Sequence, residues 1–320
     1  MAPEGVTVGL FRLKKAGIWL IIEKTEKTPD FFERLFAMEK QRRLRFTVLC
    51  ENVVANLRGI GEHGFAVFVE TETGTYLFDT GVGIGILRNS LTFSRDLRSV
   101  QKILLSHGHY DHTGGLKDVL SVTGPIEVHG HPAIFDEKYA LEHAGEDMTV
   151  RFIGMPERRE SLEASGADFH LGSGFRDIAK GVYLTGEIPR LSSFERGDKR
   201  LAVKRGEVYD VDTVPDDGAL VISTEMGLVV LLGCAHAGMV NTLEHVRRNL
   251  PGAPLHAVIG GTHWGILPED AVELSIKAIA DMEVGTVGVC HCTGIAYAAK
   301  LIRAVGERGF YASVGTVFEV

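Results

Sequence analysis

The sequence predicts an α/β protein in which two sheets pack face to face and helices cover their outer surfaces. Short runs rich in β-branched and aromatic residues recur from Phe46 onward. Hairpin-length gaps separate the earlier runs, whereas helical patterns lie between the later ones. The chain has 320 residues, of which 45% are hydrophobic and 24% charged, so it can bury a large core and has a globular composition.

The N-terminal residues 1–45 differ from the rest of the chain, and we expect them to form a peripheral extension. Phe32, Leu35, Phe36 and Met38 recur at roughly helical spacing among charged residues. This pattern favours an amphipathic helix in the extension. Residues 46–320 are then expected to form one domain.

The expected strands of this domain fall into an earlier and a later set. The earlier set is FTVLCENVV, GFAVFVE, TYLFDTG, VQKILLS and PIEVHG, and the later set is VYLTG, ALVIST, GLVVLLG, HAVIGG and VGTVGVCH. Helices are expected in VNTLEHVRRNL and PEDAVELSIKAIADM. Residues 136–180 and 192–217 are polar and look irregular, and loops of that length usually serve as lids or binding loops.

Charge and cysteine content limit the classes of partner. The formal net charge of −8 disfavours a nucleic-acid-binding protein, because such proteins usually present a basic surface. No apolar run approaches the roughly 20 residues needed to span a bilayer. The four cysteines do not resemble a disulfide framework. We therefore expect a cytoplasmic protein that binds neither nucleic acid nor a membrane.

The stretch LLSHGHYDHTGGL holds a dense group of metal-binding side chains between an apolar run and two glycines. His107 and His109 lie two apart in extended backbone and should point to the same side. Asp111 and His112 lie past the bend, near the start of a helix, and should point elsewhere. One turn thus offers two pairs of ligands. Such ligands suit zinc, iron or manganese, with zinc the usual choice for hydrolytic chemistry.

This motif, preceded by Phe78-Asp79-Thr80-Gly81, resembles the metallo-β-lactamase fold superfamily. The resemblance implies that residues 46–320 form a catalytic domain, a four-layer αββα sandwich with the metal site at one edge between the sheets. It also implies that Asp79 lies beneath the metals and holds the histidine-rich turn through hydrogen bonds. The last ligand of the superfamily, a histidine at a late strand end, matches His291 in VGVCHCTG.

Two ligand positions depart from the superfamily pattern. The turn that usually supplies a third histidine corresponds to GEIPR, which places Glu187 there. The strand that usually precedes a bridging aspartate ends instead in Cys234-Ala235-His236. We expect His236 to be a replacement ligand. Glu187 and Cys234 are further candidates, although Cys234 is equally compatible with a small buried strand residue. These departures leave open whether one or two ions bind.

Several motifs together resemble a subgroup associated with methanopterin-type cofactor biosynthesis: HYDHTGGL, GEIPR, GCAHAGMVNTLEH, GGTHW and HCTG. The subgroup activity is that of 7,8-dihydropterin-6-methyl-4-(β-D-ribofuranosyl)aminobenzene 5′-phosphate synthase. The resemblance implies that a dihydropterin-methyl diphosphate is joined to 4-(β-D-ribofuranosyl)aminobenzene 5′-phosphate with release of pyrophosphate. One alternative is a metal-dependent hydrolase of a phosphate ester or other small ester. Another is a metal-binding sensor without turnover.

Residues around the ligands should decide the chemistry on a small, phosphorylated substrate. A divalent metal, with zinc first and magnesium, manganese or iron as alternatives, can stabilise charge on a leaving phosphate or generate hydroxide. Asp111 is a candidate catalytic residue as well as a candidate metal ligand. His263 is a candidate for substrate binding or proton transfer, and Arg190 for holding a phosphate. Trp264 is a candidate for stacking on a pterin-like ring. The alternatives are a core or capping histidine, a surface arginine and a packing aromatic.

Overall fold

The computed structural model describes residues 10–15, 18–23, 39–144 and 147–320. The helix predicted around Phe32 and Met38 lies outside the described residues. Earlier in the extension, β1 (Leu10–Lys15) and β2 (Ile18–Glu23) pair as an antiparallel hairpin. The division of the chain at residue 46 stays a prediction, and the strand nearest to it, β3, begins at Leu44.

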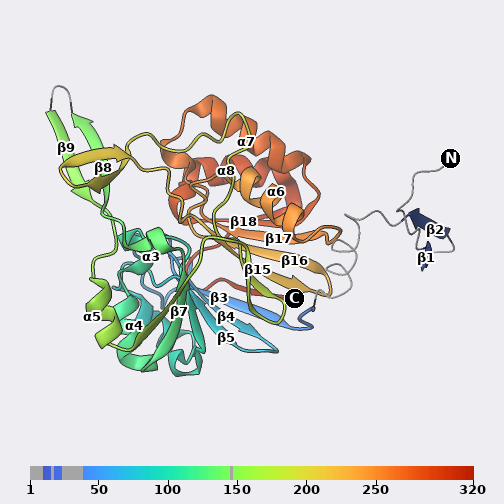
Figure 1. Ribbon diagram of the computed structural model, residues 1–320, viewed down its shortest axis with the longest axis horizontal. Coiled ribbons are helices and arrows are strands. Elements are labelled where there is room, and N and C mark those ends of the chain that lie inside the picture. Colours follow the sequence, from blue (N-terminus) through green and yellow to red (C-terminus); the bar gives the residue numbers. More distant parts are fainter. Residues whose placement is uncertain (1–9, 16–17, 24–38, 145–146) are drawn as a thin grey trace, which may run out of the picture.

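Two seven-stranded sheets form the centre of the molecule (Figure 1). In the first sheet, hairpins join three antiparallel strands and the next three strands are parallel. Its order is β10 (Ala167–Leu171), β7 (Ile126–Gly130), β6 (Lys102–Leu104), β5 (Thr75–Phe78), β4 (Ala66–Thr71), β3 (Leu44–Cys50) and β20 (Val317–Glu319).

The second sheet begins with antiparallel strands and ends with four parallel ones. Its order is β11 (Arg176–Ala179), β12 (Val182–Leu184), β15 (Ala219–Thr224), β16 (Gly227–Leu232), β17 (Leu255–Gly260), β18 (Val284–Val289) and β19 (Gly309–Tyr311). Both sets of strands expected from the sequence are confirmed, the earlier set in the first sheet and the later set in the second.

Helices cover the outer face of each sheet. The helices α2 (Ile86–Thr92), α4 (Leu116–Thr123) and α5 (Arg159–Ala164) pack on the first sheet. The helices α6 (Met239–Asn249), α7 (Glu269–Asp281) and α8 (Ile295–Val305) pack on the second. Shorter helical turns are α3 (Tyr110–Thr113), η1 (Leu97–Ser99), η2 (Pro132–Phe135), η3 (Trp264–Ile266), η4 (His291–Thr293) and η5 (Gly306–Arg308). The predicted αββα sandwich is thereby confirmed.

Alternation along the strands explains why these four layers form. In β16, Val229 and Leu231 pack between the two sheets, while Val230 and Leu232 pack against the helices. A strand that is buried on both faces is apolar throughout, as GLVVLL is. Full burial of each such side chain stabilises the fold by about 1.5–3 kcal/mol.

A separate four-stranded sheet arises from the two segments predicted to be irregular, and that prediction is wrong. Its order is β14 (Val208–Val211), β13 (Leu201–Arg205), β8 (Lys138–Ala144) and β9 (Asp147–Phe152). We call it the inserted sheet, and Figure 1 shows β8 and β9 projecting from the sandwich. Its strands look polar because one face is partly open to solvent, with Phe152 46% and Val211 62% exposed.

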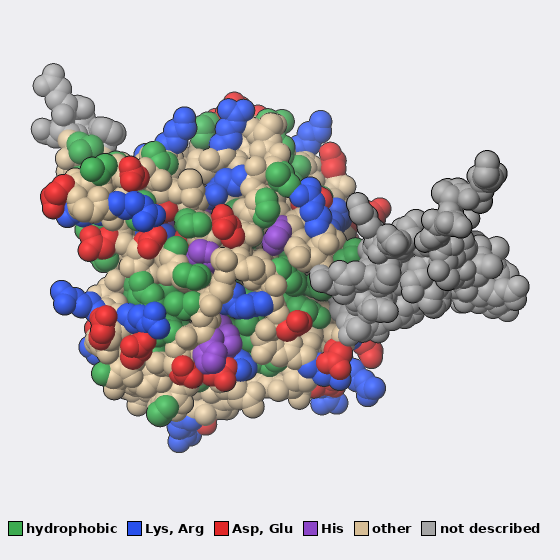
Figure 2. Space-filling view, in the orientation of Figure 1, with side chains coloured by type: hydrophobic (Ala, Val, Ile, Leu, Met, Phe, Trp, Pro, Cys, Tyr) green, Lys and Arg blue, Asp and Glu red, His purple; other side chains and the backbone are tan. Residues whose placement is uncertain are grey.

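On the face of the molecule shown in Figure 2, acidic and basic side chains are interspersed. Within the described ranges, no helix combines the length and hydropathy that a membrane span requires.

Candidate metal centre

The candidate ligands follow strands whose carboxyl ends meet at one edge of the sandwich. Asp79 follows β5 and His107 follows β6, and these two strands are parallel neighbours in the first sheet. Cys234, His263 and His291 follow β16, β17 and β18, which are parallel neighbours in the second sheet. Because parallel strands end at the same side, segments far apart in the chain converge there.

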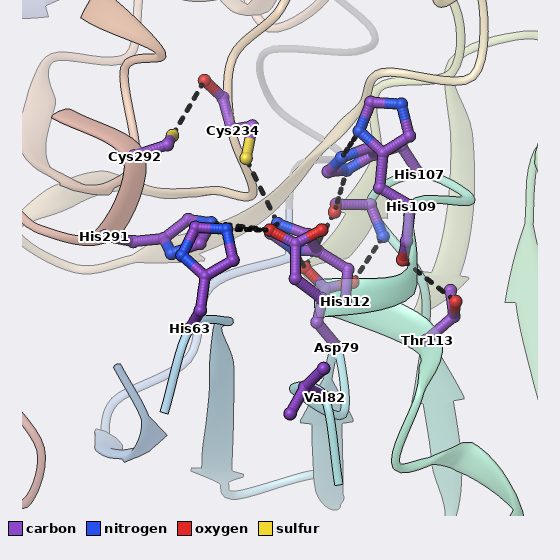
Figure 3. A network of polar contacts seen from close by, with 12 residues as sticks. His63, Asp79, Val82, His107, His109, His112, Thr113, Cys234, His291 and Cys292 are labelled. Carbon is purple, nitrogen blue, oxygen red and sulfur yellow. Dashed lines mark hydrogen bonds and ion pairs between the residues drawn. The ribbon is translucent and has the colours of Figure 1, made fainter. Parts of the chain in front are cut away.

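Four buried residues offer ligand atoms that lie within 4.8 Å of one another: Asp111, His112, Cys234 and His291. We call them the first ligand group. The Oδ2 atom of Asp111 lies 3.3 Å from Nε2 of His291 and 3.8 Å from Nε2 of His112. The Nε2 atom of His112 lies 3.1 Å from Sγ of Cys234. In Figure 3 the Cys234 sulfur is directed toward His112.

A second ligand group consists of His107, Cys234 and His236, whose ligand atoms also lie within 4.8 Å of one another. His109 lies beside this group, with Nδ1 3.0 Å from Nε2 of His107 and its ring centroid 4.8 Å from that of His236. Cys234 belongs to both groups. It therefore occupies the place where the resemblance implies a bridging aspartate.

Asp79 lies beneath the histidine-rich turn and contacts two parts of it. Its Oδ2 atom lies 2.7 Å from Nδ1 of His112 and accepts a 2.7 Å hydrogen bond from the Ser106 hydroxyl, while Oδ1 accepts from the Ser106 amide. The same hydroxyl lies 2.8 Å from Nδ1 of His107. Close approach of the two sheets requires Gly233, where an added Cβ would come 2.2 Å from the Ser106 oxygen. This geometry matches what the resemblance implies for Asp79.

Burial decides the charge of most of the imidazoles. It lowers the pKa values of His107, His109 and His236 well below their ordinary value, so these rings are neutral near neutral pH. Neutral imidazole is the form that binds a metal. Moreover, the buried Nε2 atoms of His109 and His236 have no hydrogen-bond partner among the described residues. Buried polar atoms without a hydrogen-bond partner are rare. The imidazole, thiol and carboxylate groups gathered here fit a divalent cation.

Two neighbouring carboxylates oppose the effect of burial on the pKa of His112. Burial alone would lower its pKa, but Asp111 and Asp79 together raise it to about 9. In turn, burial would raise the pKa of Asp111, yet His112 and His291 hold it well below its ordinary value. Without a metal, His112 is therefore cationic near neutral pH. Metal binding at its Nε2 atom would displace that proton.

A cavity of about 300 Å³ lies between the ligand groups and the inserted sheet. Its lining includes His109, Asp111 and His236 on the side of the ligands. Glu142 and Arg151 line it from the inserted sheet. Such a concave site next to candidate ligands can admit a small molecule.

Two of the residues predicted to contact the substrate, His263 and Trp264, lie in different surroundings. His263 lines this cavity, with its ring centroid 4.1 Å from that of His236 and Nε2 3.8 Å from Oδ2 of Asp198. Burial would lower the pKa of His263, but Asp198 and Cys292 raise it to about 9. Trp264, by contrast, is 1% exposed in the core of the second sheet. It packs rather than facing the main cavity, so the predicted ring stacking is not supported.

Arg190 and Glu187 lie outside the ligand groups. Arg190 donates from Nη2 to the His236 carbonyl at 3.3 Å and lines a cavity of about 70 Å³ with Arg196, Lys199 and His236. Glu187 is exposed and belongs to none of the ligand groups found in the described part of the chain. The position beside His107 is occupied by His236. The candidate role of Glu187 as a ligand is therefore not supported.

The structure also adds residues that the sequence analysis missed. His63 lies 3.3 Å from Oδ2 of Asp111 through Nε2, although 57% of its side chain is exposed. Figure 3 shows it beside His291, whose Nδ1 lies 2.8 Å from Oδ1 of Asn52 and whose amide donates to Glu51 at 2.6 Å. No sequence signal could have found them, because each is a single polar residue about 240 positions from His291.

Comparison with known proteins agrees with the fold. A family model described as the metallo-beta-lactamase superfamily matches residues 59–247. The chain belongs to this superfamily. A curated relative from Methanocaldococcus jannaschii is 30% identical over 243 residues, which are 73% of this chain and 81% of the relative. It is named 7,8-dihydropterin-6-methyl-4-(beta-D-ribofuranosyl)-aminobenzene-5'-phosphate synthase.

Other proteins match over a similar extent. An uncharacterized protein from Methanocaldococcus jannaschii is 27% identical over 276 residues, covering 85% of this chain and 99% of the relative. A crystal structure described as a metal-dependent hydrolase of the beta-lactamase superfamily is 29% identical, with a TM-score of 0.73 and coverage of 87% of this chain and 99% of that one. The metallo-beta-lactamase fold protein YhfI from Bacillus subtilis shares the fold at 12% identity, a TM-score of 0.51, and coverage of 88% and 100%.

Proposed function

We propose that this protein is a metal-dependent enzyme that acts on a phosphorylated small molecule at the open edge of the sandwich. The observation that carries the proposal is the first ligand group, whose four buried ligand atoms lie within 4.8 Å of one another beside a cavity of about 300 Å³. His107, His109 and His236 are the proposed ligands of a second ion position. Zinc is the first choice, because it accepts imidazole, thiolate and carboxylate together.

A bound divalent ion would stabilise charge on a phosphate oxygen or make hydroxide available near neutral pH. The chain itself supplies residues that suit an anionic substrate. Arg190, Arg196 and Lys199 line the smaller cavity beside His236. The two carboxylates that also line this cavity are already paired, Asp198 with Arg200 and Asp212 with Lys138. The cationic groups are therefore available for a phosphate.

His263 is the proposed residue that orients the substrate or moves a proton. It faces the main cavity next to His236, and its nearest carboxylate belongs to Asp198. Its backbone adopts φ 55, which is uncommon for a residue with a side chain. Such conformations are kept where the surrounding structure requires them, and they often lie at functional sites.

For the reaction, we propose the joining of a dihydropterin-methyl diphosphate to 4-(β-D-ribofuranosyl)aminobenzene 5′-phosphate, with release of pyrophosphate. The support is the 30% identity to the synthase of Methanocaldococcus jannaschii over most of both chains. Hydrolysis of a phosphate ester or other small ester is the second candidate. It is favoured by the likeness to the structure described as a metal-dependent hydrolase.

The ligand assignment is tested by metal analysis of the purified protein and of His109→Ala and His291→Ala. We expect the protein to carry zinc and each variant to lose at least part of it. His170→Ala is the matched control, because this histidine is partly exposed on β10 and pairs with Asp168. Unchanged metal content in both ligand variants would show that the site is assigned wrongly.

The reaction is tested by measuring pyrophosphate release from the pterin diphosphate with and without the arylamine phosphate. Release that requires the arylamine supports transfer, and release in water alone supports hydrolysis. A metal-loaded protein that is inactive on the diphosphate and on a panel of phosphate and carboxylate esters would contradict both, and would favour a metal sensor.

A further inference from the structure

The segment between β14 and β15 runs beside both turns that carry the proposed ligands. At its end, the Gly218 amide donates to the Ser106 carbonyl at 3.0 Å. Just before it, two consecutive aspartates, Asp216 and Asp217, are only 2% and 1% exposed. Consecutive buried carboxylates are costly unless each has a partner, so their partners indicate what they do.

Asp216 binds the turn that carries His107 and His109. Its Oδ2 atom accepts a 2.7 Å hydrogen bond from the amide of Gly108, the residue between the two histidines. A carboxylate that accepts from a backbone amide forms a charge-assisted hydrogen bond, which is stronger than a neutral one. Holding the Gly108 amide in place fixes the backbone from which the imidazoles of His107 and His109 project.

Asp217 binds the turn that carries Cys234 and His236. Its Oδ2 atom accepts a 2.8 Å hydrogen bond from the amide of Ala237. Its Oδ1 atom is buried and has no hydrogen-bond partner among the described residues. Neighbouring carboxylates therefore connect two turns that belong to different sheets of the sandwich.

Lys138 connects Asp216 to the inserted sheet. It is the first residue of β8, its side chain is fully buried, and its Nζ atom lies 2.8 Å from Oδ1 of Asp216 and 3.0 Å from Oδ2 of Asp212. Because a buried ion pair contributes little net stability, its presence is better explained by the orientation it gives to Asp216.

We propose that Asp216 and Asp217 are positioning residues that set the separation of the two ligand turns, and that Lys138 orients Asp216 from the inserted sheet. The inference rests on the ligand assignment under the proposed function. It predicts that the two aspartates control metal affinity without touching the metal. Residues that act on ligands in this way typically change metal affinity by about 10–100-fold.

The oxygen atoms of each aspartate determine which substitution is informative. Both oxygens of Asp216 accept from donors, so the amide of Asp216→Asn must set its NH2 group against a donor. One oxygen of Asp217 has no partner, so Asp217→Asn can keep the bond to Ala237 while Asp217→Ala cannot. Asn89→Asp is the matched control, because Asn89 is buried and bonds Leu49 and Ile60 but neither a ligand turn nor Lys138.

The experiment measures zinc affinity by competition with a chromophoric chelator, together with the visible spectrum of the cobalt-substituted protein. Thermal unfolding of the metal-free protein reports on general stability. We expect Asp216→Asn and Asp217→Ala to weaken zinc binding about 10-fold or more and to alter the cobalt spectrum. Asp217→Asn and Asn89→Asp should keep a zinc affinity within about threefold of that of the parent protein, although Asn89→Asp should also melt at a lower temperature because the carbonyls of Leu49 and Ile60 lose their donor.

Two results would overturn the inference. One is parental zinc affinity in Asp216→Asn and Asp217→Ala. The other is an equal loss of zinc affinity in Asn89→Asp, which would indicate general destabilisation. If Asp216→Asn does not fold, the test rests on comparing the zinc affinities of Asp217→Asn and Asp217→Ala. These two variants differ in whether the side chain at position 217 can accept from the Ala237 amide. Failure of the ligand assignment is distinguishable, because His109→Ala and His291→Ala would then keep the metal content of the parent protein.

Discussion

The Nδ1 atom of His112 lies 2.7 Å from Oδ2 of Asp79, and neither side chain is exposed. An ion or hydrogen-bond partner of His112 must therefore approach Nε2, the atom that faces Cys234 at 3.1 Å. A carboxylate behind an imidazole fixes the ring orientation and raises the basicity of the other nitrogen. In the proposed site, Asp79 would thus set the direction from which a metal approaches His112.

Asp79→Asn should weaken zinc binding by about 10–100-fold, because the side-chain amide has one acceptor oxygen and cannot accept from both the Ser106 backbone amide and His112, which contact different oxygens of Asp79. Asparagine is the appropriate substitution, since it tolerates the φ of 58 at this position. A chelator competition titration measures the effect. Asp96→Asn, which removes the charge of an exposed N-cap residue that pairs with Arg98, is the control. Equal zinc affinity in Asp79→Asn and the parent protein would contradict the role of Asp79.

Cys234→Ser should remove the sulfur-to-metal charge-transfer absorption that we expect in the cobalt-substituted protein. Cys234 is the proposed ligand common to both groups, and a metal-bound cysteine is a thiolate. The spectrum of Cys50→Ala should stay like that of the parent, because Cys50 is buried in the core between the first sheet and its helices. A parent cobalt protein that lacks this absorption would show that Cys234 is not a ligand.

Gly108→Ala should destabilise the protein and reduce its metal content. An added Cβ would lie 2.2 Å from the Ile134 carbonyl oxygen, a backbone atom that cannot turn aside. We expect a loss of about 2 kcal/mol or more in the free energy of unfolding, from denaturant titration. Gly174→Ala meets no described atom within 4 Å and should change stability by less than about 0.5 kcal/mol. Similar stabilities of the two variants would contradict this account of the turn.

Stability should fall as pH rises from about 4.5 to about 7 because of Glu195. Burial raises the pKa of Glu195 from 4.5 to about 7, despite the hydrogen bonds it accepts from the Val240 and Asn241 amides. The folded state then binds more protons than the unfolded state in this window, so the free energy of unfolding decreases with pH, by roughly 3 kcal/mol at most. Urea titrations across the window measure the slope.

Glu195→Gln is the comparison for this pH dependence. The amide keeps the shape of the side chain but does not titrate, so the slope should be clearly shallower in this variant. Identical slopes for the parent and Glu195→Gln would exclude Glu195 as the cause.

The main layers of the fold were predictable because alternation and burial leave local patterns. The run GLVVLLG predicted a strand of the later set, and the structure places it in β16 at the centre of the second sheet. The inserted sheet was not predictable, because strands with one partly open face, such as DMTVRF, mix polar and apolar residues as loops do.

By itself, the sequence determined the spacing of His107, His109, Asp111 and His112, since one turn holds all four and its backbone sets where they point. Only the tertiary structure decided that His236 rather than Glu187 lies beside His107, and that Asp216 contacts the Gly108 amide. Gly108 and Asp216 are 108 positions apart in the chain. Their contact depends on how the two sheets and the inserted sheet pack, and packing at that separation leaves no repeating pattern in the sequence.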